Sequence, residues 1–462
     1  MKAIPYDFYA RTIERTRTIK HIGKVVQIVG LVVESQGPSV SIGDLCFIEN
    51  VIGQEGIKAE VVGFRDNRVL LMPFGLVSGI TLGSRVVTTG ERISAPVGPG
   101  LIGRVLGGLG EPIDGKGPVV AGEMRVVDAA PIQALKRRRI SEAVRTGIKA
   151  IDVMAACGKG QRMGIFAGSG VGKSVMLGMI ARGSTADVNV IALVGERGRE
   201  VREFLEKDLG SEGLKRSVVV AVTSDQPALI RVKGAFLATA IAEYFRDQGK
   251  DVMLLMDSLT RIAIAQREIG LAVGEPPATK GFTPSVFAML PRLLERAGTN
   301  EKGSITGLYT VLVEGDDFSE PISDAVRSIL DGHITLSRKL AMRNQYPAVD
   351  VVDSISRLMV EVCSPDHLEL AAHIREIVAT YMDAEDLINI GAYVKGSSDR
   401  IDYAISKIDI INTFFRQRID EICDFNETLA ELGGIVRRDE DKEPAGEEVQ
   451  LSSAEGSSAQ RA

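Results

Sequence analysis

The stretch Met163-Gly164-Ile165-Phe166-Ala167-Gly168-Ser169-Gly170-Val171-Gly172-Lys173-Ser174 decides the fold of this chain. Its first four residues form an apolar run that predicts a buried strand. A glycine-rich loop ending in Lys-Ser follows, and the apolar residues 175–180 then have helical spacing. A loop of this composition between a strand and a helix is typical of phosphate binding. The sequence therefore predicts an enzyme that hydrolyses a nucleoside triphosphate.

Each residue type in this loop has a physical role in binding phosphate. The glycines let backbone N–H groups turn toward the β- and γ-phosphates, and the helix N-terminus adds a partial positive charge. Lys173 is predicted to bridge phosphate oxygens, and the Ser174 hydroxyl to bind Mg²⁺. The first position of the strict motif holds glycine, so Ala167 fits only if its φ angle stays negative. The predicted nucleotide-binding residues are Gly168, Ser169, Gly170, Val171, Gly172, Lys173 and Ser174.

The composition indicates a globular protein with more than one core. The chain has 462 residues, 45% hydrophobic and 25% charged, which suits roughly two to four domains. We expect a cytoplasmic protein, because no apolar stretch approaches the roughly 18 residues of a membrane span and the N-terminus lacks the apolar core of a signal peptide. The four widely spaced cysteines favour reduced thiols over a metal site. The net charge of -6 argues against nucleic acid as a partner, and we interpret the basic run 136–139 as a solvated loop.

Hydrophobic patterning divides the chain into five segments, and the predicted fold class is α/β. Short alternating β-branched runs between Gly, Pro and Asn turns predict a small β-barrel over residues 21–93. Strands and helices alternate over residues 94–365, which predicts a mostly parallel sheet flanked by helices and carrying the phosphate loop. Helical spacing predicts a C-terminal helical domain over residues 366–436. Residues 1–20 are either a frayed terminus or a docking arm, and residues 437–462 are expected to be disordered.

Two further apolar strands are predicted to bring carboxylates to the edge of the sheet where the phosphate loop lies. Strand 188–194 is followed by Glu196, which can orient or deprotonate the water that attacks the γ-phosphate. Strand 251–257 ends in Asp257, which we predict to hold Mg²⁺ through its water shell. The alternative role for Asp257 is to cap the next helix.

Other charged residues after Glu196 compete for catalytic roles. Glu200 and Glu203 are rival carboxylates, but their spacing from nearby arginines predicts a salt-bridged helix surface. Arg197 is predicted either to steady the Glu196 carboxylate or to contact the γ-phosphate.

A second motif resembles a known family. The stretch Tyr346-Pro347-Ala348-Val349-Asp350-Val351-Val352-Asp353-Ser354-Ile355-Ser356-Arg357 is similar to the signature of the rotary ATP synthase α and β subunits. The barrel-like start, the phosphate loop and the Gly195-Glu196-Arg197 turn also occur in that family, so the resemblance covers residues 21–435. Within the family the chain looks most like the ATPases of type III protein export, in which Ala167 is usual. The stretches that carry this likeness are 166–170, 254–261, 266–270, 274–279 and 312–317.

The resemblance implies a homohexameric, Mg²⁺-dependent ATPase that energises type III protein export, most like the flagellar export ATPase, with the virulence injectisome ATPase as the alternative. It implies that Glu196 activates water and that Asp257 is the carboxylate on the metal side. Arg357 would be an arginine finger from a neighbouring subunit, with an ordinary ion pair as the alternative. Tyr346 would pack on the adenine ring.

The resemblance also implies partners. The arm at residues 1–20 would dock on a regulatory or stator protein, and the C-terminal domain would face the export gate, a stalk protein and chaperone–cargo complexes. The protein would then lie in the cytoplasm, peripherally at the export apparatus of the inner membrane.

Two other functions share the same core motifs. A nucleotide-binding subunit without turnover is disfavoured because the non-catalytic synthase chains replace the carboxylate that Glu196 supplies here. An RNA translocase would need a basic, aromatic RNA-binding face. Residues 21–93 hold few aromatic side chains, namely Phe47, Phe64 and Phe74.

Overall fold

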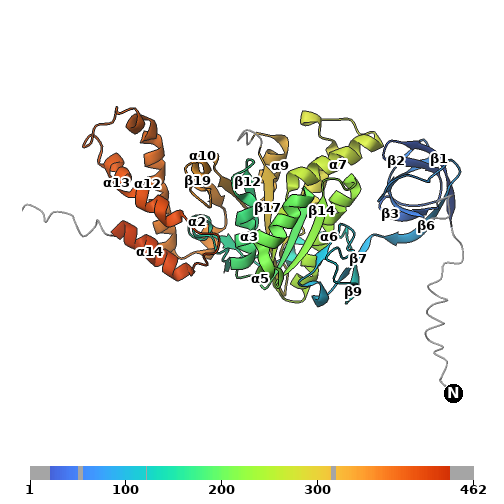
Figure 1. Cartoon of the computed structure of the whole chain (residues 1–462), viewed down its shortest axis with the longest axis horizontal. Coiled ribbons are helices and arrows are strands. Elements are labelled where there is room, and N and C mark those ends of the chain that lie inside the picture. The colour runs from blue at the N-terminus through green and yellow to red at the C-terminus, as the bar shows by residue number, and fades with distance from the viewer. Residues whose placement is uncertain (1–20, 50–55, 121, 314–318, 438–462) are drawn as a thin grey trace, which may run out of the picture.

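The computed structural model describes residues 21–49, 56–120, 122–313 and 319–437. Along the long axis of these residues lie a β-barrel, a central sheet with helices on both faces, and a group of C-terminal helices (Figure 1). The predicted fold class is confirmed. The predicted arm at residues 1–20 and residues 438–462 of the predicted tail lie outside the described residues, so both stay predictions.

Six strands among the described residues close the N-terminal barrel, and neighbouring strands are antiparallel. Closure leaves no edge strand open to pairing with another chain. The barrel interior is apolar and includes Val33, Ile48, Val61 and Leu71. The strand order is β1 (Ile22–Val29), β2 (Val32–Gln36), β5 (Arg68–Pro73), β4 (Ile57–Arg65), β3 (Asp44–Ile48) and β6 (Arg85–Arg92).

The central sheet is mostly parallel, which gathers the carboxyl ends of its strands at one edge. The apolar runs predicted as strands in this region, 163–166, 188–194 and 251–257, are the strands β12, β13 and β15. The sheet order is β19 (Val349–Ser356), β18 (Gly332–Leu336), β12 (Arg162–Ala167), β17 (Ser304–Leu312), β15 (Asp251–Asp257), β13 (Val188–Glu196), β14 (Ser217–Thr223) and β8 (Val105–Leu106). The antiparallel or separate short strands are β16 (Gly298–Thr299), β7 (Ser94–Val97), β9 (Glu123–Val126), β10 (Ala143–Val144) and β11 (Cys157–Gly158).

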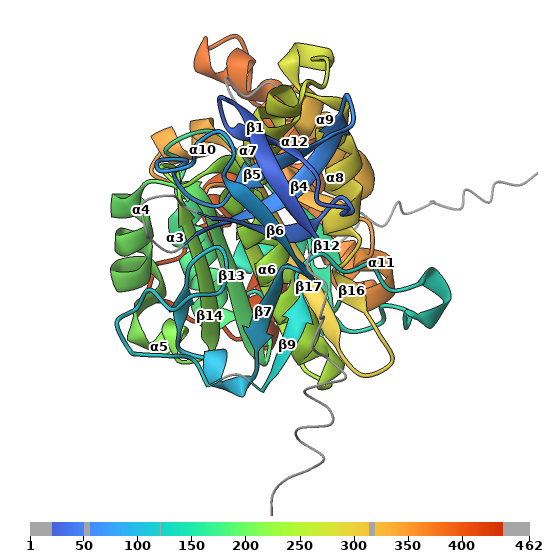
Figure 2. The same ribbon diagram turned by 90° about the vertical axis from the view of Figure 1, so that its right-hand side faces the viewer.

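Helices cover both faces of the sheet (Figure 2). The first face is covered by α6 (Ala228–Asp247), α7 (Leu259–Val273), α8 (Pro284–Leu294) and α9 (Pro321–Ile329). The opposite face carries α2 (Lys149–Met154), α3 (Lys173–Gly183), α4 (Gly198–Glu203), a π-helical turn η3 (Phe204–Leu209) and α5 (Gly210–Leu214). Shorter elements are η1 (Pro99–Leu101), η2 (Ala134–Lys136), η4 (Thr279–Gly281), α10 (Arg338–Met342) and α11 (Met359–Val362).

The C-terminal helices share a hydrophobic core with the face of the sheet that carries α3. These helices are α12 (Pro365–Asn389), α13 (Asp399–Phe415) and α14 (Phe425–Arg437). Buried Ile374, Ile411 and Phe414 belong to the same continuous cluster as Met176 and Leu177 of α3. Among the described residues, none of the helices combines the length and the apolar character needed to cross a membrane.

The basic run 136–139 is largely exposed, as predicted for a solvated loop, but two of its arginines are also anchored to the protein. Arg137 donates hydrogen bonds to the carbonyl of Ala297 and, by a short contact, to that of Glu295. Arg138 donates to the carbonyl of Asn300 at 2.8 Å. The backbone acceptors that bind these guanidinium groups lie about 160 residues away in the chain, beyond the reach of a local pattern.

A buried ion pair joins the barrel to the central domain. Lys233 on α6 lies 2.7 Å from Glu60 on β4, and the two side chains are only 11% and 9% exposed. Burial raises the pKa of Glu60, and the ammonium of Lys233 opposes that shift. A carboxylate this far from water depends on its partner to stay charged.

Replacing Lys233 with Met is expected to weaken this junction by about 3–5 kcal/mol, because Glu60 is left buried without its cation. Hydrogen exchange at β4 and α6 should then become faster. The matched control is the double variant Lys233→Met, Glu60→Leu, which removes both charges and should exchange more slowly than the single variant. Equal exchange in the two variants would show that the ion pair does not stabilise the junction.

Candidate active site

The predicted phosphate loop lies between the end of β12 and the start of α3, as the motif requires. Gly170 and Gly172 have φ angles of 79° and 85°, a left-handed conformation that glycine adopts without steric cost. Ala167 is the last residue of β12, and its φ angle is not positive. It therefore fits the first position of the motif in place of glycine. The first turn of α3 points its free N–H groups toward the loop.

Two carboxylates converge on Lys173. The Lys173 Nζ atom lies 2.5 Å from Oδ1 of Asp257 and 4.0 Å from Oε1 of Glu196. Asp257 is 2% exposed and also accepts a 2.7 Å hydrogen bond from the Thr310 hydroxyl. The ends of β13 and β15 and the start of α3 thus form one cluster, in which a lysine lies between two acids.

Asp257 does not cap the helix that follows it. Ser258 is the N-cap of α7, and its hydroxyl accepts a 3.4 Å hydrogen bond from the N–H of Arg261. The Asp257 carboxylate is directed instead to Lys173 and Thr310.

The side chains at this edge suit Mg²⁺, which binds carboxylate and hydroxyl oxygens and in NTP sites takes few protein ligands beside the phosphates. The described residues contain no group of three or more His, Cys, Asp or Glu that could hold a metal ion alone. Asp257 and the exposed Ser174 are therefore the protein's predicted contribution to a site that the nucleotide would complete.

Arg261, for which no role was predicted, binds the carboxylate of Glu196. Its Nε and Nη2 atoms lie 3.0 and 3.1 Å from the two carboxylate oxygens. Gly195 makes this approach possible, because a Cβ there would lie 2.9 Å from the Arg261 side chain. Burial, together with the charge of Asp257, raises the pKa of Glu196 to about 7, although Lys173 and Arg261 oppose the shift.

The rival residues on α4 differ from one another. Glu203 pairs with Lys207 at 2.8 Å on the surface, as predicted. Glu200 also pairs with a nearby arginine, as predicted, and its interaction with Glu196 lowers the pKa of Glu200. The Arg197 side chain is 76% exposed and lies 3.6 Å from Glu200.

A cavity of about 350 Å³ lies beside the phosphate loop. Tyr346 flanks it, and a Cβ on Gly172 would lie 3.3 Å from the Tyr346 ring, so ring and loop are in close contact. The lining is otherwise mostly apolar and includes Gln417 and Ile419 from the C-terminal region, which the sequence did not suggest. The residues that line the cavity are Gly170, Val171, Gly172, Val175, Met176, Met179, Leu336, Tyr346, Pro347, Ala348, Gln417 and Ile419.

Arg357 lies at the opposite end of the sheet from its own phosphate loop. Its N–H donates to the carbonyl of Asp331, and the preceding residue Ser356 pairs with Gly332 at the start of β18. The loop begins where the parallel neighbour β12 ends. Six residues of β12 at about 3.3 Å each separate the two ends by roughly 20 Å. Within the part of the chain that the structure describes, the exposed Arg357 forms no ion pair.

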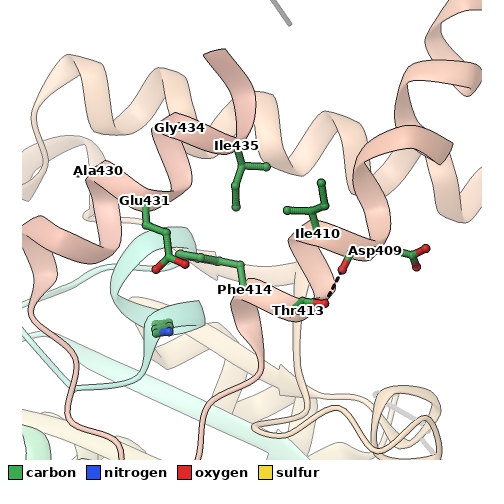
Figure 3. Close-up of a pocket in the computed structure, with 9 residues that line it drawn as sticks. Asp409, Ile410, Thr413, Phe414, Ala430, Glu431, Gly434 and Ile435 are labelled. Carbon is green, nitrogen blue, oxygen red and sulfur yellow. Dashed lines mark hydrogen bonds between the residues drawn. The ribbon is translucent and has the colours of Figure 1, made fainter. Parts of the chain in front are cut away.

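A larger cavity, of about 600 Å³, lies between α13 and α14 and contains no residue of the phosphate loop (Figure 3). The side chains of Phe414 and Glu431 point into the space between the two helices. We assign the nucleotide to the smaller cavity, because that one adjoins the loop and the Lys173 cluster.

Comparisons with known proteins cover nearly the whole chain. Family models described as ATP synthase alpha/beta family, beta-barrel domain and nucleotide-binding domain match residues 25–90 and 147–356. A model described as T3SS EscN ATPase C-terminal domain matches residues 363–434.

Two curated relatives and one solved structure are similar over most of their lengths. The flagellum-specific ATP synthase of Bacillus subtilis (strain 168) is 56% identical over 93% of this chain and 98% of the relative. The type 3 secretion system ATPase of Xanthomonas euvesicatoria is 50% identical over 90% of this chain and 94% of the relative. The structure of the assembled ATPase EscN in complex with its central stalk EscO, from enteropathogenic E. coli, has a TM-score of 0.82 and 45% identity and covers 89% of this chain and 99% of that chain.

In the protein without ligands, Glu196 is expected to be about half protonated near pH 7, since burial raises the pKa of its carboxyl to about 7. Carbon-13 NMR titration of the glutamate carboxyls measures this, with the signal assigned by its loss in Glu196→Gln. Arg261→Gln should move the titration to higher pH, because the guanidinium favours the charged carboxylate. Arg202→Gln is the matched control, since Arg202 pairs with Glu206 on the outer side of α4. A Glu196 signal that titrates with the ordinary glutamates would contradict the assignment.

Proposed function

This chain belongs to the ATP synthase alpha/beta family and is an ATPase, and on that premise we propose a Mg²⁺-dependent homohexamer that energises type III protein export. The flagellar system is favoured over the injectisome because the flagellar relative is the more similar of the two. The observation that carries the proposal is the position of Lys173 between Asp257 and Glu196 at the end of the phosphate loop.

In this proposal Lys173 exchanges its partner when ATP binds. Without phosphate, the ammonium is neutralised by Asp257. The β- and γ-phosphates offer Lys173 a stronger anionic partner, which frees Asp257 to hold the metal together with Ser174. When bound, Mg²⁺ would neutralise part of the phosphate charge.

Glu196 then acts on the attacking water. Its carboxylate is held by Arg261 at the carboxyl edge of the sheet, beside the position of the phosphates. A carboxyl with a pKa of about 7 can both orient water and take up a proton near neutral pH. Arg197 was predicted either to steady the Glu196 carboxylate or to contact the γ-phosphate. Because Arg261 steadies the carboxylate, Arg197 remains a candidate for the phosphate contact.

Arg357 acts across a subunit boundary in this proposal. Roughly 20 Å of sheet separates it from the loop of its own chain, so it is too far away to reach its own γ-phosphate. An exposed guanidinium near the edge strand β19 can instead serve the loop of a neighbouring copy. The solved structure of EscN, described as assembled, supports self-association.

The proposed partners follow from the relatives and from the sequence. EscN is described in complex with its central stalk EscO, and we propose a stalk protein of the same kind for this chain, beside the export gate and chaperone–cargo complexes. Residues 1–20 would dock on a regulatory protein. The proposed location is the cytoplasm, peripheral to the export apparatus of the inner membrane.

The Lys173→Ala and Glu196→Gln variants are each expected to lose most ATP turnover, by different routes. Losing Lys173 removes a direct phosphate contact, so nucleotide affinity should fall. Glu196→Gln removes the charge that orients water but little volume, so affinity should stay close to wild type. Calorimetric titration with ADP and a steady-state phosphate assay measure the two effects. An equal loss of affinity in both variants would refute the role given to Glu196.

Mixed rings test whether the site is shared. Lys173→Ala and Arg357→Ala should each be nearly inactive alone, since an arginine finger contributes on the order of 10³–10⁵ in rate in other NTPases. A mixed ring contains some interfaces with an intact loop and an intact arginine, so mixing should restore part of the activity. Co-assembly is checked by differently tagged chains. If Arg357→Ala alone hydrolyses ATP at the wild-type rate, the arginine-finger assignment is wrong.

A further inference from the structure

Residues 416–424, which connect α13 to α14, form one wall of the cavity beside the phosphate loop. We call them the pocket segment. Gln417 and Ile419 of this segment line the cavity opposite residues of the loop and α3. The segment comes from the C-terminal helices, yet it is attached to the nucleotide-binding domain.

Gln417 attaches the segment through its side-chain amide and its backbone N–H. Its Nε2 group donates to the carbonyls of Gly147 and Glu421, at 2.7 and 3.1 Å, and its Oε1 accepts from the N–H of Lys149 at 3.0 Å. Its backbone N–H donates to the carbonyl of Tyr346 at 2.9 Å. The side chain is 6% exposed. Both amide hydrogens and the amide oxygen are thus engaged by the protein.

Two weaker attachments support the same segment from outside. Arg182 of α3 donates a 2.7 Å hydrogen bond to the carbonyl of Ile419. Lys149 pairs with Glu421 at 2.9 Å. Arg418, by contrast, points away from the domain and pairs with Asp420 at 3.2 Å, with both side chains largely exposed.

We propose that Gln417 is a positioning residue that sets the nucleotide's base site, by fixing Tyr346 and Ile419 on either side of the cavity. The inference rests on the proposed function, with the base in this cavity and Tyr346 packed on it. Ile419 and Tyr346 are 56% and 40% exposed, so neither is enclosed by its neighbours. The side chain of Gln417 anchors the segment to Gly147 and Lys149. The backbone N–H of Gln417, two residues before Ile419, then holds the Tyr346 carbonyl.

The phosphates are bound elsewhere, by the loop and Lys173, and the hydrogen bonds of Gln417 go to other residues. The contribution of Gln417 should therefore depend on the base. An apolar pocket whose sides are fixed before binding loses little freedom when the base enters, whereas a loosened pocket must be ordered at the cost of affinity. An ordering cost equal to the net contribution of about one hydrogen bond corresponds to roughly a five- to tenfold change in affinity.

The test compares a probe with a base and a probe without one. Full-length Gln417→Met keeps the side-chain volume and the backbone bond to Tyr346 but lacks the side-chain hydrogen bonds to Gly147, Lys149 and Glu421. Calorimetry with ADP should show a roughly five- to tenfold weaker dissociation constant, whereas inorganic tripolyphosphate should bind within about twofold of wild type. The KM for ATP should rise with little change in kcat, because the lost interaction is made equally in the ground and transition states. Arg418→Ala, in the same segment, is the matched control and should bind both probes as wild type does.

The role of Gln417 and the assignment of the nucleotide site can fail independently. Equal weakening of both probes by Gln417→Met would mean general structural damage and overturn the proposal, as would unchanged ADP affinity. If Gln417→Met does not fold, Arg182→Gln releases the same segment at Ile419 and should weaken ADP, but not tripolyphosphate, by a smaller factor. If Lys173→Ala leaves wild-type affinity for both probes, the proposed site itself is wrong.

Discussion

The ion pair between Lys173 and Asp257 is the contact on which the rest of the active site depends. The two side chains are only 12% and 3% exposed, and a charge so far from water is costly unless its partner is in contact with it. The pair also defines the edge of the sheet at which chemistry can occur, because it joins the first residue of α3 to the last residue of β15. Glu196 lies 4.0 Å from the same ammonium, so the charges of both Lys173 and Asp257 act on its carboxyl group.

The two carboxylates of this cluster have different surroundings. Asp257 is tied to the ammonium of Lys173 and to the Thr310 hydroxyl. Glu196 has two cationic neighbours, yet burial and the charge of Asp257 outweigh them and raise its pKa. The two carboxylates on one sheet edge therefore differ: Asp257 has two direct hydrogen-bond partners, whereas Glu196 exchanges protons near neutral pH.

The sequence was sufficient for the parts of the site that depend on local pattern. Apolar runs predicted the strands that end at Ala167, Glu196 and Asp257, and the parallel arrangement then required their last residues to meet at one edge. Arg261 and Gln417 were missed because their partners are 65 and up to 270 residues away in the chain. No periodicity encodes such pairs. A basic residue in the first turn of the helix after β15 was the available signal for Arg261.

The position of Arg357 at the far end of the sheet has a genetic consequence. On the proposed arrangement, each chain contributes its loop to one interface of the ring and its arginine to another. A folded subunit that lacks both groups would therefore disable two neighbouring sites instead of one. In a cell that also makes the normal protein, such an allele would be dominant, and its severity would grow steeply with the fraction of defective chains.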